Sequence, residues 1–339
     1  MPNDNKAYEQ ISLFVNKYRK ILLIAAFVVT LVLPFVIKSQ YIIRIIVMIG
    51  VYAVLGLSLN LVTGYTGQVS LGHAAFFAIG AYASAILSTK YGMGFFESAP
   101  MGALIAGFCG LLLGLPTLRL SGSYLSITTM GFCEVVRMIF LNWDSMTNGP
   151  MGIQKIPKPE FFGTTLTLGN KGLYYLMLAM VVVTTYCISA IVNSKTGRAL
   201  KAIRDDELAA GMMGVRTTRM KVFAFTVSAF FSGFAGAFYA HMINYIDPNS
   251  FTFDTSILIL SIVILGGMGT LTGPFLGSAL LVSFPEALRF MQEYRFVVYG
   301  LILVIMMRYK PQGVLGGQKR TPYVLPKGVA RPETAKAKE

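Results

Sequence analysis

The first candidates for chemistry are ionisable and hydroxyl side chains inside long apolar runs. Glu134 and Arg137 lie three apart in the apolar run 123–141, so on a helix they share one face. Ionisable groups at membrane depth are costly unless they face other protein or water. We therefore expect the pair either to line a pore or gate, or to join helices as a structural ion pair. For Thr128 and Thr129 the alternatives are packing between helices and substrate contact.

Two glycine-rich segments interrupt the apolar pattern, one in each half of the chain. The first reads G-Y-T-G-Q-V-S-L-G-H from Gly64 to His73, and the second reads G-G-M-G-T-L-T-G-P from Gly266 to Pro274. Interrupted membrane helices in corresponding halves indicate a transport site, because their free backbone groups can bind a charged substrate. The loose similarity of the two segments leaves an internal repeat open. The expected translocation path comprises Gly64, Gly67, Gln68, Ser70, Gly72, His73, Thr128, Thr129, Glu134, Arg137, Gly266, Gly267 and Gly269.

The sequence lacks the motifs of common enzyme and metal sites. It contains no G-x-x-x-x-G-K-[ST] phosphate loop, no H-E-x-x-H and no G-x-S-x-G. His73 and His241 are its only histidines, and a hydrogen-bonded packing role is the alternative to substrate contact for His73. Cys109, Cys133 and Cys187 all lie in apolar runs, where packing is the expected role. We expect no catalytic residue, metal, cofactor or ATPase activity in this chain.

The composition indicates a membrane protein. Hydrophobic residues make up 55% of the 339 residues, charged residues only 13%, and the mean hydropathy is +0.63. A soluble domain carries about 25% charged residues, so much of this surface is expected to face lipid. The net charge of +14 comes from basic residues between the apolar runs, which follows the positive-inside rule and does not indicate nucleic-acid binding.

The apolar runs predict the fold class. A helix needs about 20 residues to cross the hydrocarbon, so we expect an all-α, polytopic protein of about ten transmembrane helices. We further expect broken or re-entrant helices at the glycine-rich segments, with 255–268 and 271–287 forming either two tilted helices or one re-entrant unit. The runs are 21–37, 41–63, 69–88, 101–118, 123–141, 172–193, 221–245, 255–268, 271–287 and 294–309.

Basic residues predict the orientation. Lysine and arginine gather in residues 1–20, 195–219 and 310–339, and even numbers of predicted spans separate these segments. We therefore expect all three to be cytoplasmic, with a transmembrane permease domain at 21–309. The loop 142–171 then faces the periplasm or the extracellular side. The tail 310–339 is rich in proline, glycine and charge, which is typical of disorder.

The cytoplasmic loop 195–219 predicts a helix that does not span the membrane. Leu200, Ile203, Leu208 and Met212 form an apolar stripe at helical spacing, and Gly211 and Gly214 are expected to end the helix. Such a helix either lies on the membrane surface or docks a cytoplasmic partner. The stretch is too polar to cross the membrane.

Several motifs together resemble one transport family. They include G-Y-T-G-Q-V-S-L-G-H-A-A-F-F-A-I-G-A-Y from Gly64, L-R-L-S-G-S-Y-L-S-I-T-T-M-G-F-C-E-V-V-R from Leu118, G-R-A-L-K-A-I-R-D-D-E from Gly197 and V-I-L-G-G-M-G-T-L-T-G-P from Val263. Between about residues 51 and 315 the chain is similar to the permeases of branched-chain amino acid ABC importers. It resembles the LivM-type subunits more closely than the LivH-type subunits.

The resemblance implies an assembly in the bacterial cytoplasmic (inner) membrane. Its expected partners are a paralogous LivH-type permease, two cytoplasmic ABC ATPases and an extracytoplasmic substrate-binding protein, within membrane lipid. The substrates would be leucine, isoleucine and valine, moved by alternating access, with urea or short amides as the alternative. A secondary ion-coupled transporter is a further alternative. By the same resemblance the ATPase-coupling residues are Arg198, Ala199, Ala202, Asp206, Glu207, Ala210 and Gly214, and the segment from Gly64 to His73 lines the translocation path.

Overall fold

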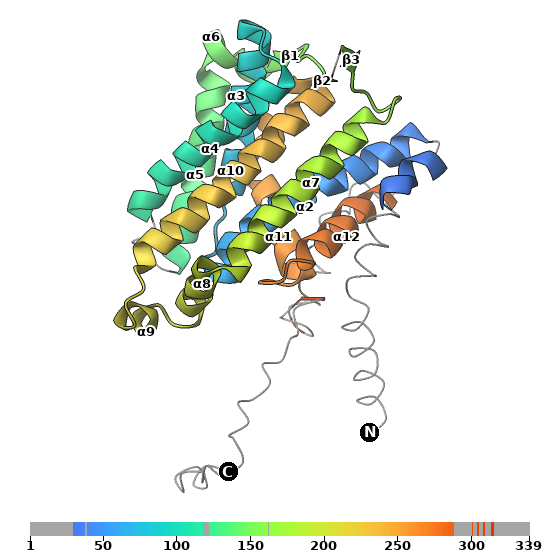
Figure 1. Ribbon diagram of the computed structural model, residues 1–339. Helices are drawn as coiled ribbons and strands as arrows, with labels where there is room; N and C mark the ends of the chain where they lie inside the picture. The colour runs from blue at the N-terminus through green and yellow to red at the C-terminus, as the bar shows by residue number, and fades with distance from the viewer. Residues whose placement is uncertain are drawn as a thin grey trace, which may run out of the picture.

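The computed structural model is a bundle of tilted helices (Figure 1). It describes residues 30–37, 39–117, 122–161 and 163–287, and single positions at 300, 304, 308, 313 and 314. The helices are α2 (Gln40–Thr66), α3 (His73–Tyr91), α4 (Phe95–Thr117), α5 (Ser123–Asn142), α6 (Asp144–Thr147), α7 (Gly172–Asn193), α8 (Lys195–Asp205), α9 (Glu207–Met212), α10 (Thr217–Ile243), α11 (Phe253–Gly266) and α12 (Gly273–Ala287). Two 3-10 turns, η1 (Gly149–Met151) and η2 (Pro248–Phe251), complete the helical elements.

Five helices of the described part are long and apolar enough to cross a membrane, namely α2, α4, α5, α7 and α10. The apolar helices α11 and α12 are shorter. The predicted count of about ten spans is therefore not confirmed, since the runs 21–37 and 294–309 lie largely outside the described residues. The runs 255–268 and 271–287 form two separate helices.

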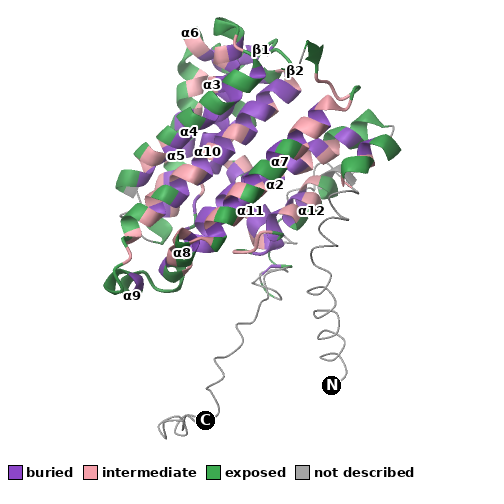
Figure 2. Cartoon of the chain, viewed as in Figure 1, coloured by how far each residue is buried: buried purple, intermediate pink, exposed green. Residues whose placement is uncertain are grey.

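The core is built around α10, which packs against α2, α3 and α4 (Figure 2). Small residues allow these backbones to approach closely, as in other membrane bundles. A Cβ atom added at Gly80 of α3 would lie 2.1 Å from the carbonyl oxygen of Gly233 in α10. A Cβ atom at Gly236 would lie 2.0 Å from the carbonyl oxygen of Phe77. The helix contacts at these positions therefore exclude any side chain.

The first glycine-rich segment interrupts the helical path, as the sequence predicts. Helix α2 ends before Gly67, residues 67–72 are not helical, and α3 begins at His73 inside the bundle. The His73 Nε2 atom lies 2.9 Å from the Ser228 hydroxyl of α10, which in turn donates to the carbonyl oxygen of Ser58. Ser58 precedes the end of α2 by eight residues, or about 12 Å of helix. Helix α3 therefore starts well inside the membrane-spanning bundle.

The second glycine-rich segment separates two short helices, as one of the two sequence alternatives predicts, and a re-entrant unit stays a prediction. Residues 267–272 form a tight turn between α11 and α12, and neither helix is interrupted. The turn requires Gly267 and Gly269, whose φ angles are 119° and 74°. Glycines therefore serve different purposes in the two segments, because one re-enters the bundle and the other reverses the chain.

Small strands lie at the end of the bundle opposite α8 and α9 (Figure 1). Strand β1 (Ile153–Gln154) pairs antiparallel with β4 (Tyr245–Ile246), and β2 (Glu160–Phe161) pairs with β3 (Thr164–Thr165). They correct the all-α prediction in this one detail. They form because the loop 142–171 folds back onto the end of α10, where the Pro157 carbonyl oxygen lies 2.7 Å from His241 Nδ1.

Candidate coupling element and translocation path

The segment predicted as one helix at 195–219 forms two helices. Asp206 takes an extended conformation (φ −160°, ψ 114°), which ends α8 and begins α9. Its Oδ1 atom accepts a hydrogen bond of 2.9 Å from the backbone N–H of Ala209, so Asp206 is the N-cap of α9. Ser194 caps α8 in the same way, accepting from the N–H groups of Thr196 and Gly197. The sequence pattern missed this division because aspartate fits both a helix and a cap.

The division separates the predicted apolar stripe into two faces. Leu200 and Ile203 of α8 are buried, and Leu200 packs in a cluster with residues of α2, α7 and α10. Leu208 and Met212 of α9 are 81% and 90% exposed, and Met213 beside them is 85% exposed. Figure 2 shows α9 as an exposed projection at this end of the bundle. Helix α8 is therefore attached to the bundle, and α9 presents its apolar side chains outward.

The predicted ATPase-coupling residues gather on these two helices and the turn after them. Ala210 is buried, Ala199 is half-buried, and the others are exposed, namely Arg198, Ala202, Asp206, Glu207 and Gly214. Glu207 is tied to the bundle, because both of its carboxylate oxygens lie 2.5 Å from Nζ of Lys221. The Lys221 side chain is only 4% exposed. Lys221 opens the apolar run 221–245, and a cation at the start of such a run is a sequence signal that could have indicated a buried ion pair.

The two glycine-rich segments meet at the α8 end of the bundle. Asn60 of α2 holds the turn between α11 and α12, because its Oδ1 accepts from the Gly269 N–H at 2.8 Å. Its Nδ2 donates to the Thr270 carbonyl oxygen at 2.7 Å. Arg204 of α8 donates from Nη1 to the Gly64 carbonyl oxygen at 2.9 Å. Of the predicted path residues, Gly64, Gly67 and Gly269 are thus brought together with Asn60 and Arg204, which the sequence analysis did not select.

A polar cavity of about 480 Å³ lies beside this junction. The cavity is lined by Gln68 from the non-helical break at 67–72 and by residues at the start of α5. Residues of α8, α9 and α10 complete the lining. Residues with charged groups of both signs line it, as do three residues with hydroxyl groups. The polar lining residues are Thr66, Gln68, Ser123, Ser126, Arg204, Glu207 and Lys221. Such a lining can hold water and a small zwitterion.

Several predicted path residues hold the break in place. The Thr129 hydroxyl accepts a hydrogen bond of 3.0 Å from the Leu71 N–H and donates one to the Ser126 carbonyl oxygen. A Cβ at Gly72 would lie 2.7 Å from the Thr129 carbonyl oxygen. Ser70 and His73 are buried, whereas Thr128 is half-buried and its hydroxyl donates to the Tyr124 carbonyl oxygen within α5. These contacts have a structural use, and substrate contact stays a prediction.

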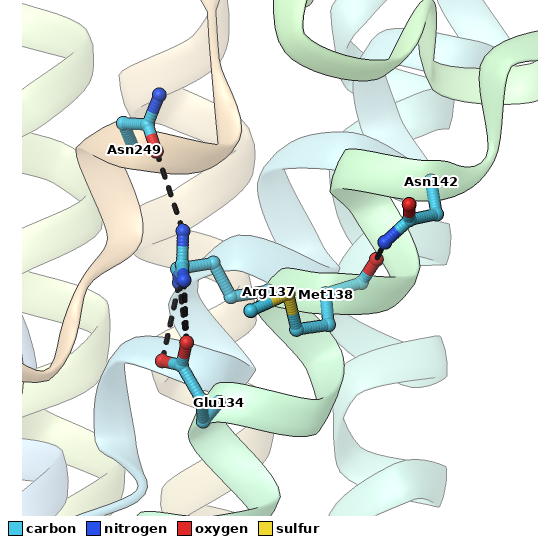
Figure 3. A network of polar contacts seen from close by, with 5 residues as sticks. All are labelled: Glu134, Arg137, Met138, Asn142 and Asn249. Carbon is cyan, nitrogen blue, oxygen red and sulfur yellow. Dashed lines mark hydrogen bonds and ion pairs between the residues drawn. The ribbon is translucent and has the colours of Figure 1, made fainter.

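Glu134 and Arg137 form an ion pair within α5, as their spacing predicts (Figure 3). The Arg137 Nε atom lies 3.0 Å from Glu134 Oε1, and Nη1 lies 3.3 Å from Asn249 Oδ1 in η2. The Glu134 side chain is 47% exposed. The Arg137 side chain is 18% exposed and joins α5 to η2, which is the structural ion-pair alternative, while a role in lining a pore or gate stays a prediction. In the described part of the chain, no three His, Cys, Asp or Glu residues gather as metal ligands.

Comparison with known protein families identifies the family to which the chain belongs. A family model described as "Branched-chain amino acid transport system / permease component" matches residues 41–307. The chain belongs to this family. The permease is 39% identical to the LivM high-affinity branched-chain amino acid permease of Salmonella typhimurium, over 88% of this chain and 75% of that protein. It is 38% identical to the LivM of Escherichia coli K12, over 94% of this chain and 79% of that protein.

A more distant relative is a different subunit type. The permease is 26% identical to the Salmonella typhimurium LivH protein, over 78% of this chain and 91% of LivH. The stronger similarity to LivM confirms the subunit type that the motifs predict. No solved structure matches the chain. The permease is thus a membrane transport subunit, in agreement with its apolar helices.

Proposed function

We propose that this permease carries leucine, isoleucine and valine across the bacterial cytoplasmic membrane as one subunit of an ABC importer. The observation that supports this most directly is α9, which projects from a transport bundle with apolar side chains in an exposed position. A monomer gains nothing from exposing Leu208, Met212 and Met213 to water, whereas a docking site for an ATPase subunit uses such side chains. ATP binding at the partner ATPases would move α8 and α9 and switch the permease between outward-open and inward-open states.

The proposed orientation places this end in the cytoplasm. Residues 1–20, 195–219 and 310–339 are the cytoplasmic segments, and 21–309 is the permease domain. The loop 142–171 lies at the opposite end, where the extracytoplasmic binding protein delivers the substrate. The ends of the bundle support this assignment, because the basic α8 and the strand-bearing loop lie at opposite ends (Figure 1).

The exposed face of α5 is the proposed contact with a paralogous LivH-type permease and part of the translocation path. Glu134 and Arg137 are ionisable and lie inside a membrane-spanning helix, and the Glu134 side chain is 47% exposed on this chain. Lipid would not solvate them, so protein or water must cover this face. The contact between Arg137 and the exposed Asn249 in Figure 3 then lies where the two permeases meet.

Photo-crosslinking tests this face. A photoreactive amino acid at position 127, where Ile127 of α5 is 65% exposed, is expected to form adducts with the second permease. The matched control is Tyr186, which is 74% exposed on α7, a helix separated from α5 by α10 in Figure 1, and it is expected to label lipid. Adducts with lipid alone at position 127 would contradict the proposed interface.

Reconstitution tests the transport reaction. The permease is assembled with its sister permease, two ATPases and binding protein in vesicles containing ATP. Leucine uptake is expected to continue when ion gradients are collapsed and to stop without ATP hydrolysis. Uptake by the purified chain alone, driven by a proton gradient, would show a secondary transporter instead. Competition of urea or acetamide with leucine would move the substrate class to amides.

A further inference from the structure

Arg204 occupies a junction that no motif assigns. It lies at the last turn of α8, and its Nη1 atom donates to the Gly64 carbonyl oxygen at 2.9 Å. Gly64 belongs to the last turn of α2, directly before the break that leads to α3. One side chain therefore connects the coupling element with the end of the interrupted helix.

The same side chain fills the space next to two further glycines. A Cβ at Gly67 would lie 3.0 Å from Arg204 Cγ, and a Cβ at Gly269 would lie 2.7 Å from Arg204 Nη1. Both glycines have a φ of 74°, so both stand at bends of the chain. Arg204 thus contacts the re-entrant break and the turn between α11 and α12 at once.

Helix α8 is held rigidly enough that a movement of the helix would also move Arg204. The buried Leu200 and Ile203 fix the same side of the helix against the bundle, because Leu200 is four residues before Arg204, and Ser194 caps its first turn. The next helix, α9, is tied to α10 by the Glu207–Lys221 ion pair. The guanidinium of Arg204 reaches both glycine-rich segments from this rigid support, and it keeps 36% side-chain exposure beside the polar cavity.

We propose that Arg204 is the positioning residue that transmits movement of α8 to both glycine-rich segments, so that ATP-driven displacement of the coupling element opens or closes the path. This inference rests on the proposed function, because it presumes an ATPase acting on α8 and α9. The Arg204 side chain alone would then carry the movement of α8 to Gly64, Gly67 and Gly269. A guanidinium suits the task because its planar group of donors holds a fixed geometry.

The test compares transport with ATP hydrolysis in the complete reconstituted importer. In Arg204→Ala, hydrolysis stays near the wild-type rate and the leucine transported per ATP falls by about tenfold or more, within the usual range of coupling between sites. Arg204→Lys recovers part of this ratio, because an ammonium can donate to the Gly64 carbonyl oxygen without filling the space at Gly67 and Gly269. Lys195→Ala, which removes an exposed cation from the same helix, leaves the ratio unchanged.

A spectroscopic readout separates transmission from simple stability. Spin labels replace the exposed Val69 in the break and Tyr91 at the end of α3, after the three native cysteines are changed to serine. The distance between the labels is expected to change when ATP is trapped in the wild-type importer. In Arg204→Ala the change is expected to disappear while hydrolysis continues.

The outcomes distinguish this inference from the proposed function. Wild-type uptake that does not need ATP overturns the proposed function. A wild-type importer that is coupled, together with an Arg204→Ala variant that keeps its transport per ATP, overturns only the role of Arg204. Loss of hydrolysis and transport together assigns Arg204 to assembly and overturns the inference too. If Arg204→Ala fails to insert, Arg204→Gln is measured against the same criteria.

Discussion

Aspartate in place of Leu208 or Met212 is expected to weaken binding of the ATPase subunits by about thirtyfold or more while the permease stays folded. Both side chains are more than four-fifths exposed, so neither contributes packing to this chain. An apolar side chain central to an interface is worth about 2 kcal/mol or more, which is roughly a thirtyfold change in affinity. A new carboxylate buried in that interface adds a desolvation cost.

Co-purification and titration with the purified ATPase measure this effect. The matched control is Met151→Asp, which changes an exposed methionine (71%) two residues before β1, a strand at the opposite end of the bundle, and is expected to leave ATPase binding intact. Charge reversal at Glu207 is a poorer test, because it also leaves the buried Lys221 without its carboxylate. Unchanged affinity in both aspartate variants would show that the ATPase docks elsewhere.

Gly64→Ala is expected to eliminate uptake and to lower the stability of the permease. The added Cβ would lie 2.0 Å from Asn60 Oδ1 and 2.4 Å from the backbone N of Gly269, and these two atoms are hydrogen-bonded to each other. The methyl group therefore forces the turn at 267–272 away from α2. Inserting a methyl group into a packed site costs about 1–3 kcal/mol.

Thermal unfolding in detergent and leucine uptake in vesicles measure the two parts of this prediction. Gly94→Ala is the matched control, since its Cβ meets nothing within 4 Å and its backbone is not left-handed. Wild-type uptake in Gly64→Ala would show that α2 and the turn at 267–272 can separate without loss of function. Normal uptake with lowered stability would show that the contact between Gly64 and the turn at 267–272 stabilises the fold but is not needed for transport.

Some elements could be predicted from the sequence because local physics determines them. The long apolar runs define α2, α5, α7 and α10 to within a few residues, since membrane helices must satisfy their own backbone hydrogen bonds. The glycine-rich segment from Gly64 to His73 predicts the break, because glycine weakens a helix locally. The spacing of Glu134 and Arg137 predicts their ion pair, because residues three apart on a helix are neighbours.

Which side chains face the core and which face the surroundings of the chain could not be predicted from the sequence. In a membrane bundle both the lipid-facing and the core-facing positions are apolar, so hydropathy does not separate them. On α4, Leu104 is 62% exposed while its neighbour Ala103 is fully buried. The same ambiguity of apolar positions hid that Leu208 projects while Leu200 is packed.

The sequence by itself determined a membrane transport subunit, its main helices, the place of its break and the family to which it belongs. Only the tertiary structure decided that Asn60, Arg204, Gly64 and Gly269 form one junction. Asn60 and Gly269 are 209 residues apart, and Arg204 and Gly64 are 140 apart. Contacts across such separations depend on how helices pack, and close packing depends on shape at each contact rather than on any local pattern of residue types.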